Sequence, residues 1–277
     1  MATADFTRIA SNIGALNALN SLKDVNTKLG IHQQRLATGQ RINSAGDDPA
    51  GNTIANKLMA RSEGMKTAQN NIADAKNLLA VADSGLGKMS DILVKMRNLA
   101  QTGASDTMGA DERDALVKQM TSYAEQLDDL TKQTKWNNTT LLSTSALTFQ
   151  TGADSSDTTQ FTGLTGLDSA GLSVSISLTS ASTASNFASF MTTVDTAINT
   201  VSSKIADVGK LINKLTFKEE QLAVAQVNVE ASYNRIMNAD MAMEQLEATK
   251  YSILQQTSTT MLAQANTAPQ GVLSLFR

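Results

Sequence analysis

The chain contains no cysteine, so no disulfide staples its fold and no thiolate can serve as a nucleophile or metal ligand. Its single histidine, His32, excludes any catalytic or metal site that needs two histidines from one chain. Aromatic residues make up 4% and charged residues 18% of the 277 residues, with a formal net charge of −3. A nucleic-acid-binding protein would need a basic face, which this charge balance does not provide.

Long apolar runs are also missing. The first residues contain no charged segment followed by a long apolar stretch, so we expect no cleaved secretory signal. No run approaches 18 apolar residues, and we expect no membrane-spanning helix. A cytoplasmic protein, or one exported by a route that removes no signal, would both look like this.

Heptad periodicity is the strongest positive signal. One seam of apolar residues steps by seven from Leu58 to Ala100, and a second seam lies three residues further on, at Ala68, Ala75, Ala82, Met89 and Met96. The C-terminal half repeats the pattern from Val194 to Met243, with companions that begin four residues on and later shift to three. Such a/d patterns over many heptads indicate coiled-coil helices.

These periodic segments predict four helices, at about residues 5–38, 50–102, 110–133 and 188–265. Residues that are typical of helix starts and ends lie at the bounds of these predicted helices. Asp48 before Pro49 is a good helix start, Gly103 is a helix end, and Asp111 and Glu112 suit the first turn of the third helix. The only other proline is Pro269, so proline stays out of the predicted helix interiors.

The middle of the chain has a different composition. It contains no Lys or Arg from residue 136 to 203, and Ser and Thr supply 20 of the 44 residues from 143 to 186. Strict alternation over residues 172–178 predicts a half-buried strand, with residues 147–150 as a weaker partner. A solvated Ser/Thr-rich loop is the alternative. Trp136 is expected to anchor the core at the turn after the third helix.

Together these patterns predict a mainly α fold: a long antiparallel coiled-coil rod, with paired N- and C-terminal helices and a small β element in the middle. A two-helix pair is thin and leaves apolar faces open, among them Leu254, Met261 and Leu262. Exposed apolar surface of this extent implies partners, and identical copies joined by a contact that does not close would form a helical filament.

Several segments resemble the signatures of bacterial flagellin. At the N-terminal side they are RLATGQRINSAGDDPAGNTIAN at 35–56 and QTKWN at 133–137. At the C-terminal side they are ADMA at 239–242, LQQ at 254–256, MLAQAN at 261–266 and APQGVLSL at 268–275. The likeness covers about residues 5–140 and 190–277. The hook–filament junction proteins have similar terminal helices, but the C-terminal signature favours flagellin.

The resemblance implies a structural subunit that polymerises into the flagellar filament for motility. It implies an inner filament core of paired terminal helices (1–42 and 236–277), an outer helical rod (43–142 and 188–235) and a short exposed variable region (143–187). It also implies export of the unfolded chain by the type III route, an extracellular location in the filament, and an export chaperone, filament cap and junction proteins as partners.

From the terminal helices and the signature segments we predict a set of subunit-interface residues. Arg35 and Arg41 are expected to form an interfacial ion pair with Asp47 or with an acid of a neighbouring subunit, although solvated arginines are an open alternative. His32 is expected to be a polar interface or core residue. The predicted interface residues are Leu22, Leu29, Arg35, Leu36, Arg41, Asn43, Asp47, Asp48, Leu254, Met261, Leu262, Leu273 and Leu275.

Other functions have less support. A coiled-coil adaptor would form a closed oligomer and would not need its C-terminal tail. An enzyme is not expected, because Gly85 and Gly87 lie inside the heptads and lack the spacing of a phosphate-binding loop. Two neighbouring carboxylates at Asp47 and Asp48 are too few for a metal site, so we expect no metal, no cofactor and no catalytic residue.

Many flagellins are detected by an innate immune receptor through a patch on the second helix. The corresponding segment here is LVKMRNL at 93–99, where Lys95 stands in place of the arginine common in recognised members. A lysine point charge does not replace an arginine fork. Binding of this receptor is therefore doubtful for this chain.

Overall fold

A computed structural model describes residues 12–144, 146–179 and 182–274. The chain forms two compact units, one of Met1–Ala60 with Val229–Arg277 and one of Arg61–Asn228. The helices of the described residues are α1 (Ile13–Thr38), α2 (Pro49–Gly103), α3 (Ala110–Gln133), α4 (Ala184–Met237) and α5 (Met241–Ser274). None of them is long and apolar enough to cross a membrane.

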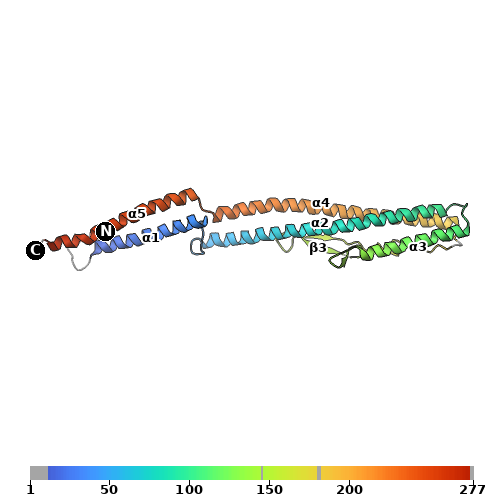
Figure 1. The fold of residues 1–277 in the computed structure, drawn as a ribbon, viewed down its shortest axis with the longest axis horizontal. Helices are drawn as coiled ribbons and strands as arrows, with labels where there is room; N and C mark the ends of the chain where they lie inside the picture. Colours follow the sequence, from blue (N-terminus) through green and yellow to red (C-terminus); the bar gives the residue numbers. More distant parts are fainter. Residues whose placement is uncertain (1–11, 145, 180–181, 275–277) are drawn as a thin grey trace. The chain divides into compact units, whose positions relative to one another are not determined.

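In the first unit α1 and α5 lie side by side and antiparallel (Figure 1). Hydrogen bonds mark the pairing along its length: Asn12 Nδ2 donates to the carbonyl of Ala265, and Gln255 Nε2 donates to Asn26 Oδ1. The first bond joins residues that are 253 positions apart in the sequence, and the second joins residues that are 229 positions apart. The predicted pairing of the two terminal helices is confirmed for the described residues, while positions 5–11 of the predicted first helix lie outside them.

The predicted single helix over 188–265 is wrong, because α4 ends at Met237 and α5 begins at Met241. The interruption lies beside the end of α1: the amide of Ala239 donates to the carbonyl of Gly39, and that of Arg41 donates to the carbonyl of Met237. Asp240 then starts the new helix, since its Oδ1 accepts the amides of Ala242 and Met243. Heptad periodicity runs through this point and conceals the break.

A small apolar cluster lies where the chain passes from α1 to α2 and from α4 to α5. Ile42 and Ala55 are almost fully buried with Met237, and Tyr233 and Ile236 pack against them. Pro49 begins α2 as predicted, and Asp48 Oδ1 accepts the amide of Gly51 as the expected cap. The chain can therefore leave α1 and re-enter a helix without leaving buried amides unpaired.

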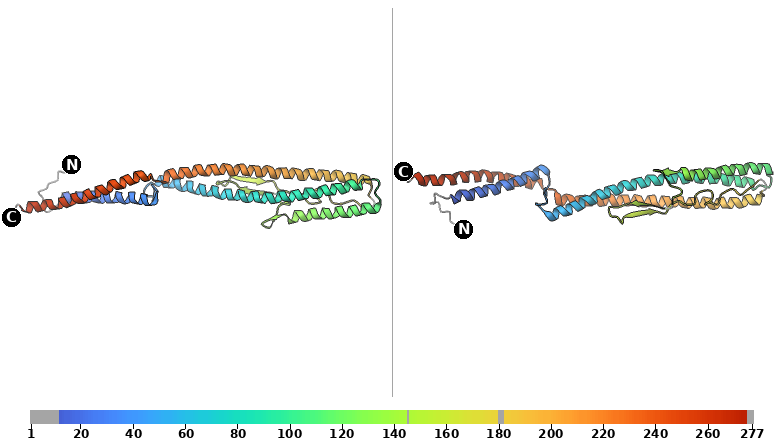
Figure 2. Two further views of the ribbon diagram at one scale, coloured as in Figure 1. Left: turned by 45° about the horizontal axis from the view of Figure 1, so that its top comes forward. Right: turned by 90° about the horizontal axis from the view of Figure 1, so that it is seen from below.

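In the second unit α2 and α4 run side by side and antiparallel (Figure 2). Ion pairs connect the two helices, Lys76 with Glu219 at 2.9 Å and Arg97 with Asp195 at 2.5 Å. Both heptad seams of α2 are buried, at positions Met65, Ala68, Ile72, Ala75, Leu79, Ala82, Leu86, Met89, Leu93, Met96 and Ala100. On α4 one seam is buried from Val194 to Leu222, whereas the companion residues Ile198, Ile205 and Ile212 are half-buried.

α3 begins with Asp111 and Glu112 in its first turn, as predicted, and leads into a tight hairpin. The hairpin pairs β1 (Lys135–Trp136) with β2 (Thr139–Thr140) across Asn137 and Asn138, both of which have positive φ. The prediction that Trp136 anchors the core is wrong: the side chain is 36% exposed on this hairpin. A two-residue turn of this kind suits asparagine, which tolerates the left-handed region.

The middle contains a small β element, as predicted, but its strands differ from those expected. β3 (Leu147–Gln150) pairs antiparallel with β4 (Thr158–Phe161). Residues 172–178 form no strand, although Leu172 and Val174 are buried as their alternation suggested. Ser173 has a φ of 58° and the segment finds no partner strand, so alternation here reflects packing against the helices rather than sheet pairing.

Candidate interaction surface

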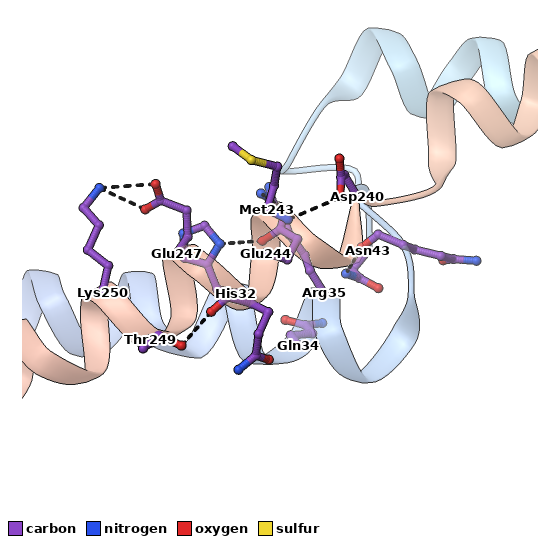
Figure 3. Close-up of polar contacts among 12 residues, drawn as sticks. His32, Gln34, Arg35, Asn43, Asp240, Met243, Glu244, Glu247, Thr249 and Lys250 are labelled. Atoms are coloured by element: carbon purple, nitrogen blue, oxygen red, sulfur yellow. Dashed lines mark hydrogen bonds and ion pairs between the residues drawn. The ribbon is translucent and has the colours of Figure 1, made fainter.

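A cluster of polar contacts joins the C-terminal part of α1 to the N-terminal part of α5 (Figure 3). His32 Nδ1 lies 2.5 Å from Glu244 Oε2, and Arg35 Nη1 lies 3.4 Å from the other carboxylate oxygen. The imidazole also stacks on the ring of Tyr251, with centroids 5.3 Å apart. The His32 and Glu244 side chains are only 16% and 12% exposed. His32 is thus a polar residue of the helix pair, held by one carboxylate.

The turn between α1 and α2 is organised by Asp47. Its Oδ2 accepts the amides of Asn43 and Ser44, at 3.0 and 2.8 Å, and the Ser44 hydroxyl. The backbone hydrogen bonds from Ser44 and Asn43 lower the pKa of the Asp47 carboxyl from its ordinary value of 3.8. Gly39 ends α1 in the left-handed region, at φ 71°, which starts the turn.

Arg41 binds within its own chain. Its guanidinium donates twice to the carbonyl of Ile236 and lies 3.7 Å from Asp48 Oδ2. Arg35 has Glu244 as its partner rather than Asp47. Arg35 therefore connects α1 to α5, and Arg41 connects the α1–α2 turn to the end of α4.

α5 carries two apolar faces. One lies toward α1 and includes Ala248, which is buried. The other is open to solvent and consists of Met243, Leu246, Ile253, Leu254 and Met261, of which Ile253 is 59% and Met261 63% exposed. At about 100° per residue these five positions fall within an arc of about 100° on the helix. We call this set the outer stripe of α5.

α1 has the same two-faced design. Leu29 is buried and lies on the same side of the helix as His32, which contacts α5. Ile13, Leu16, Leu19 and Ile31 are exposed on the other side. We call these four residues the outer stripe of α1.

The α1–α5 pair itself buries little. Between residues 12 and 38 only Leu29 is buried, and between 241 and 267 only Ala248. A helix pair with so small a core is marginal in water, since most helical stability in proteins comes from packing an amphipathic face. The two outer stripes are the surfaces on which further packing could occur.

The predicted interface residues whose side chains are described fall into three groups. Leu22 and Leu36 are half-buried and Leu29 is buried, all on the side of α1 that faces α5. Leu254 and Met261 lie on the outer stripe of α5, with Leu262 half-buried nearby. Leu275 lies outside the described residues, and for Leu273 only the helical backbone is described. The polar members (Arg35, Arg41, Asn43, Asp47 and Asp48) gather around the α1–α2 turn and the start of α5.

Sequence reasoning missed the outer stripe of α1. Its members lie off the heptad seam, which passes through Ala15, Leu22, Leu29 and Leu36. The signal was the presence of large apolar residues at positions that a simple two-helix pair would leave polar. No group of three or more metal-binding side chains was found among the described residues.

Comparison with known proteins decides the family. The model of the bacterial flagellin N-terminal helical region matches residues 9–146, and that of the C-terminal helical region matches residues 191–276. The chain belongs to the bacterial flagellin family. The resemblance seen in the sequence is thereby confirmed. Flagellins are structural proteins that form the flagellar filament, and the chain is a filament subunit that serves motility.

Relatives span almost the whole chain. The chain is 32% identical to a flagellin of Bacillus subtilis, with 98% of this chain and 100% of that protein covered. It is 31% identical to a flagellin of Listeria monocytogenes and 28% identical to a flagellar filament 33 kDa core protein of Treponema phagedenis, each over 97% of this chain and 99% of the relative.

Two solved structures resemble the chain. A crystal structure of Bacillus cereus flagellin matches at 26% identity with a TM-score of 0.49, over 55% of this chain and 88% of that one. A putative flagellar hook-associated protein from Vibrio parahaemolyticus matches at 14% identity with a TM-score of 0.54, over 69% and 100%. The second likeness concerns the fold.

Proposed function

We propose that this flagellin polymerises by burying the outer stripes of α1 and α5 against other copies of itself. The observation that supports this is the pair of open apolar faces on helices whose own pairing buries almost nothing. Neighbouring subunits would remove these faces from water, with a gain of about 25 cal/mol per Å² of apolar surface. The contact is heterologous, so copies add in a helical array rather than closing into a ring.

The paired terminal helices (1–42 and 236–277) are then the inner filament core, and residues 43–142 with 188–235 the outer rod. The Ser/Thr-rich segment 143–187, without Lys or Arg, is the exposed variable region. The predicted polar residues at the α1–α2 turn, Arg41 and Asp47 among them, extend the interface beyond the helices. They keep the intrachain contacts described above while neighbouring subunits pack around them.

Folding of the terminal helices is coupled to addition of the subunit. The monomer is exported unfolded and secreted, and its α1 and α5 are only marginally stable until neighbours cover the outer stripes. The ordering entropy of the two helices is then compensated by burial in the filament. An export chaperone, the filament cap and the hook–filament junction proteins are the partners of this route, and the chain has no catalytic role.

The test is seeded elongation followed by electron microscopy. Purified chain added to short fragments of its own filaments should extend them into long uniform filaments with a central channel. A discrete dimer or tetramer that leaves the seeds unextended would contradict the proposal and favour a coiled-coil adaptor or a junction protein.

A surface variant addresses the outer stripe itself. Leu246 and Ile253 are 58% and 59% exposed, so L246S/I253S should leave the monomer fold intact, because surface substitutions usually change stability by less than about 0.5 kcal/mol each. It should extend seeds at least about tenfold more slowly, which corresponds to about 1.4 kcal/mol. The matched control is Q245S, an exposed polar residue beside the stripe, which should extend seeds normally. Equal rates for both variants would overturn the assignment.

A further inference from the structure

The methionines of the described residues differ in exposure, and Met108 and Met191 are half-buried. Five of the described methionines are buried, namely Met65, Met89, Met96, Met120 and Met237. Four are exposed to about half or more of their surface, namely Met59, Met241, Met243 and Met261. All four exposed methionines belong to the unit formed by Met1–Ala60 and Val229–Arg277. The most exposed methionines of the described residues are thus concentrated in the unit that carries the outer stripes.

Two of the exposed methionines occupy the outer stripe of α5. Met243 and Met261 are 18 residues apart, which is five turns of helix, so their side chains leave the helix in the same direction. Leu246, Ile253 and Leu254 fill the stripe between them. In Figure 3 the Met243 thioether points away from the contact between His32 and Glu244. Met59 and Met241 are equally accessible but are not part of this stripe.

An accessible thioether reacts with hydrogen peroxide in one balanced step. The sulfur lone pair attacks one peroxide oxygen, an S–O bond forms and the O–O bond breaks. The proton of the attacked oxygen passes to the departing hydroxide, which leaves as water. Sulfur loses two electrons and the peroxide gains them, so the product is methionine sulfoxide. Because the chain has no cysteine, no thiol competes for the oxidant. The product is polar and chiral where the side chain had been apolar and flexible.

We propose that Met243 and Met261 are an oxidation site that controls assembly: peroxide converts them to sulfoxides in the free subunit and thereby prevents its addition to a filament. The inference rests on the proposed function, since it assigns a chemical control to the same outer stripe. A sulfoxide oxygen buried against an apolar neighbour lacks a hydrogen-bond donor, and a buried unpaired polar group is unfavourable. Filaments already formed are protected, because their stripes are covered.

The experiment uses the full chain and hydrogen peroxide. Monomer is treated, the peroxide is removed, and sulfoxides are located by peptide mass spectrometry. Sulfoxides should form at the four exposed methionines and be absent from Met65, Met89, Met96 and Met120. Treated monomer should extend seeds at least about tenfold more slowly than untreated monomer. Treated filaments should show little sulfoxide at Met243 and Met261.

Two controls separate the site from general damage. Methionine sulfoxide reductases A and B, supplied with dithiothreitol, should restore both the thioethers and elongation of the treated wild-type chain. Peroxide-treated and untreated M243L/M261L should extend seeds at the same rate as each other, because leucine does not react with peroxide. The matched variant M59L/M241L should be inhibited as strongly as the wild type.

The outcomes distinguish this inference from the proposed function. Untreated chain that does not extend seeds would contradict the proposed function. Untreated chain that elongates, with treated chain elongating equally well while carrying both sulfoxides, would overturn the oxidation site alone. Inhibition of M243L/M261L equal to that of wild type would overturn it too, as would methionines 243 and 261 that stay unoxidised in the treated monomer.

Discussion

The side chain of Asn12 donates a hydrogen bond of 2.7 Å from its Nδ2 to the carbonyl of Ala265, four residues before Pro269. A proline has no N–H, so within α5 the carbonyl of Ala265 loses its usual partner at position 269. Asn12 supplies the missing donor from the other helix. Its Oδ1 meanwhile accepts the amide of Ala15 at 2.9 Å and caps the start of α1. The Asn12 side chain thus caps the start of α1 and also supplies a hydrogen bond to a carbonyl of α5 that lacks its helical partner.

Substitutions at Asn12 should separate these two roles. Asn12→Ala should destabilise the first turn of α1 by about 1 kcal/mol through loss of the cap, and also leave Ala265 without its donor. Asn12→Asp keeps the capping acceptor but cannot donate to Ala265. Hydrogen exchange with millisecond labelling should therefore show faster exchange in the first turn of α1 for N12A and near-normal exchange there for N12D.

A double-mutant cycle tests the link to Pro269. Pro269→Ala restores an N–H for the carbonyl of Ala265, so Asn12→Asp should affect α5 less in that background than in the wild type. Equal effects of N12D in both backgrounds would contradict the pairing of Asn12 with the proline-freed carbonyl.

Two glycines, Gly30 within α1 and Gly39 just after its last residue, should respond to alanine in opposite directions. A Cβ on either Gly30 or Gly39 would meet no atom within 4 Å, so packing does not decide the result. Gly30 lies within the helix, where alanine is favoured by about 0.8–1 kcal/mol. Gly39 has a φ of 71°, where an L side chain costs about 1–2 kcal/mol. Amide protection in α1 should rise in G30A and fall in G39A; the same sign for both would refute this account of the helix end.

Asp47 should make the α1–α2 turn sensitive to acid. Because its folded-state pKa is lowered below 3.8, its contribution to stability is present above that value and is lost as the pH falls through the lowered pKa. Asp47→Asn should therefore speed exchange of the Asn43 and Ser44 amides at neutral pH. The difference from the wild type should disappear in acid. An NMR titration of the Asp47 carboxyl should give a midpoint below 3.8, and a midpoint above it would contradict the hydrogen-bonded turn.

The heptads made most of the helical architecture predictable. The seams of α2 were identified from the sequence and are buried, because a repeat held over six heptads can only serve a helix-packing stripe. The start of α2 was also predictable, because a capping Asp48 followed by Pro49 is a local signal for a helix start. The break at 238–240 was not found, since apolar residues continue through it and Asp240 caps α5 without interrupting the pattern.

Irregular and tertiary features were harder to predict. Alternation over 172–178 placed Leu172 and Val174 inside correctly, but strand formation needs a partner, and residues 147–150 pair with residues 158–161 instead. The outer stripe of α1 was not predicted, because the heptad seam marks one face of the helix and the residues of this stripe lie on another. The predicted interface residues from Leu22 to Leu275 stay predictions until subunit contacts are measured.

The proposed coupling of folding to assembly predicts a pattern of proteolysis. In the monomer, trypsin should cut first at Lys23, Lys28 and Lys250, because Leu29 and Ala248 are the only buried residues of α1 and α5 among those whose burial is described. In filaments the same bonds should be protected. Segment 136–203 offers trypsin no Lys or Arg and should persist as a large fragment in both states. Terminal helices that resist the protease in isolated monomer would contradict the coupling.

A cryo-electron microscopy reconstruction of filaments grown from the purified chain would show directly whether the outer stripes form the subunit contacts. We expect Leu246 and Ile253 of α5, together with Leu16 of α1, to lose most of their exposed surface to neighbouring subunits. A filament in which the two outer stripes stay open to solvent or to the central channel, while other surfaces hold the subunits together, would contradict the proposed mode of assembly.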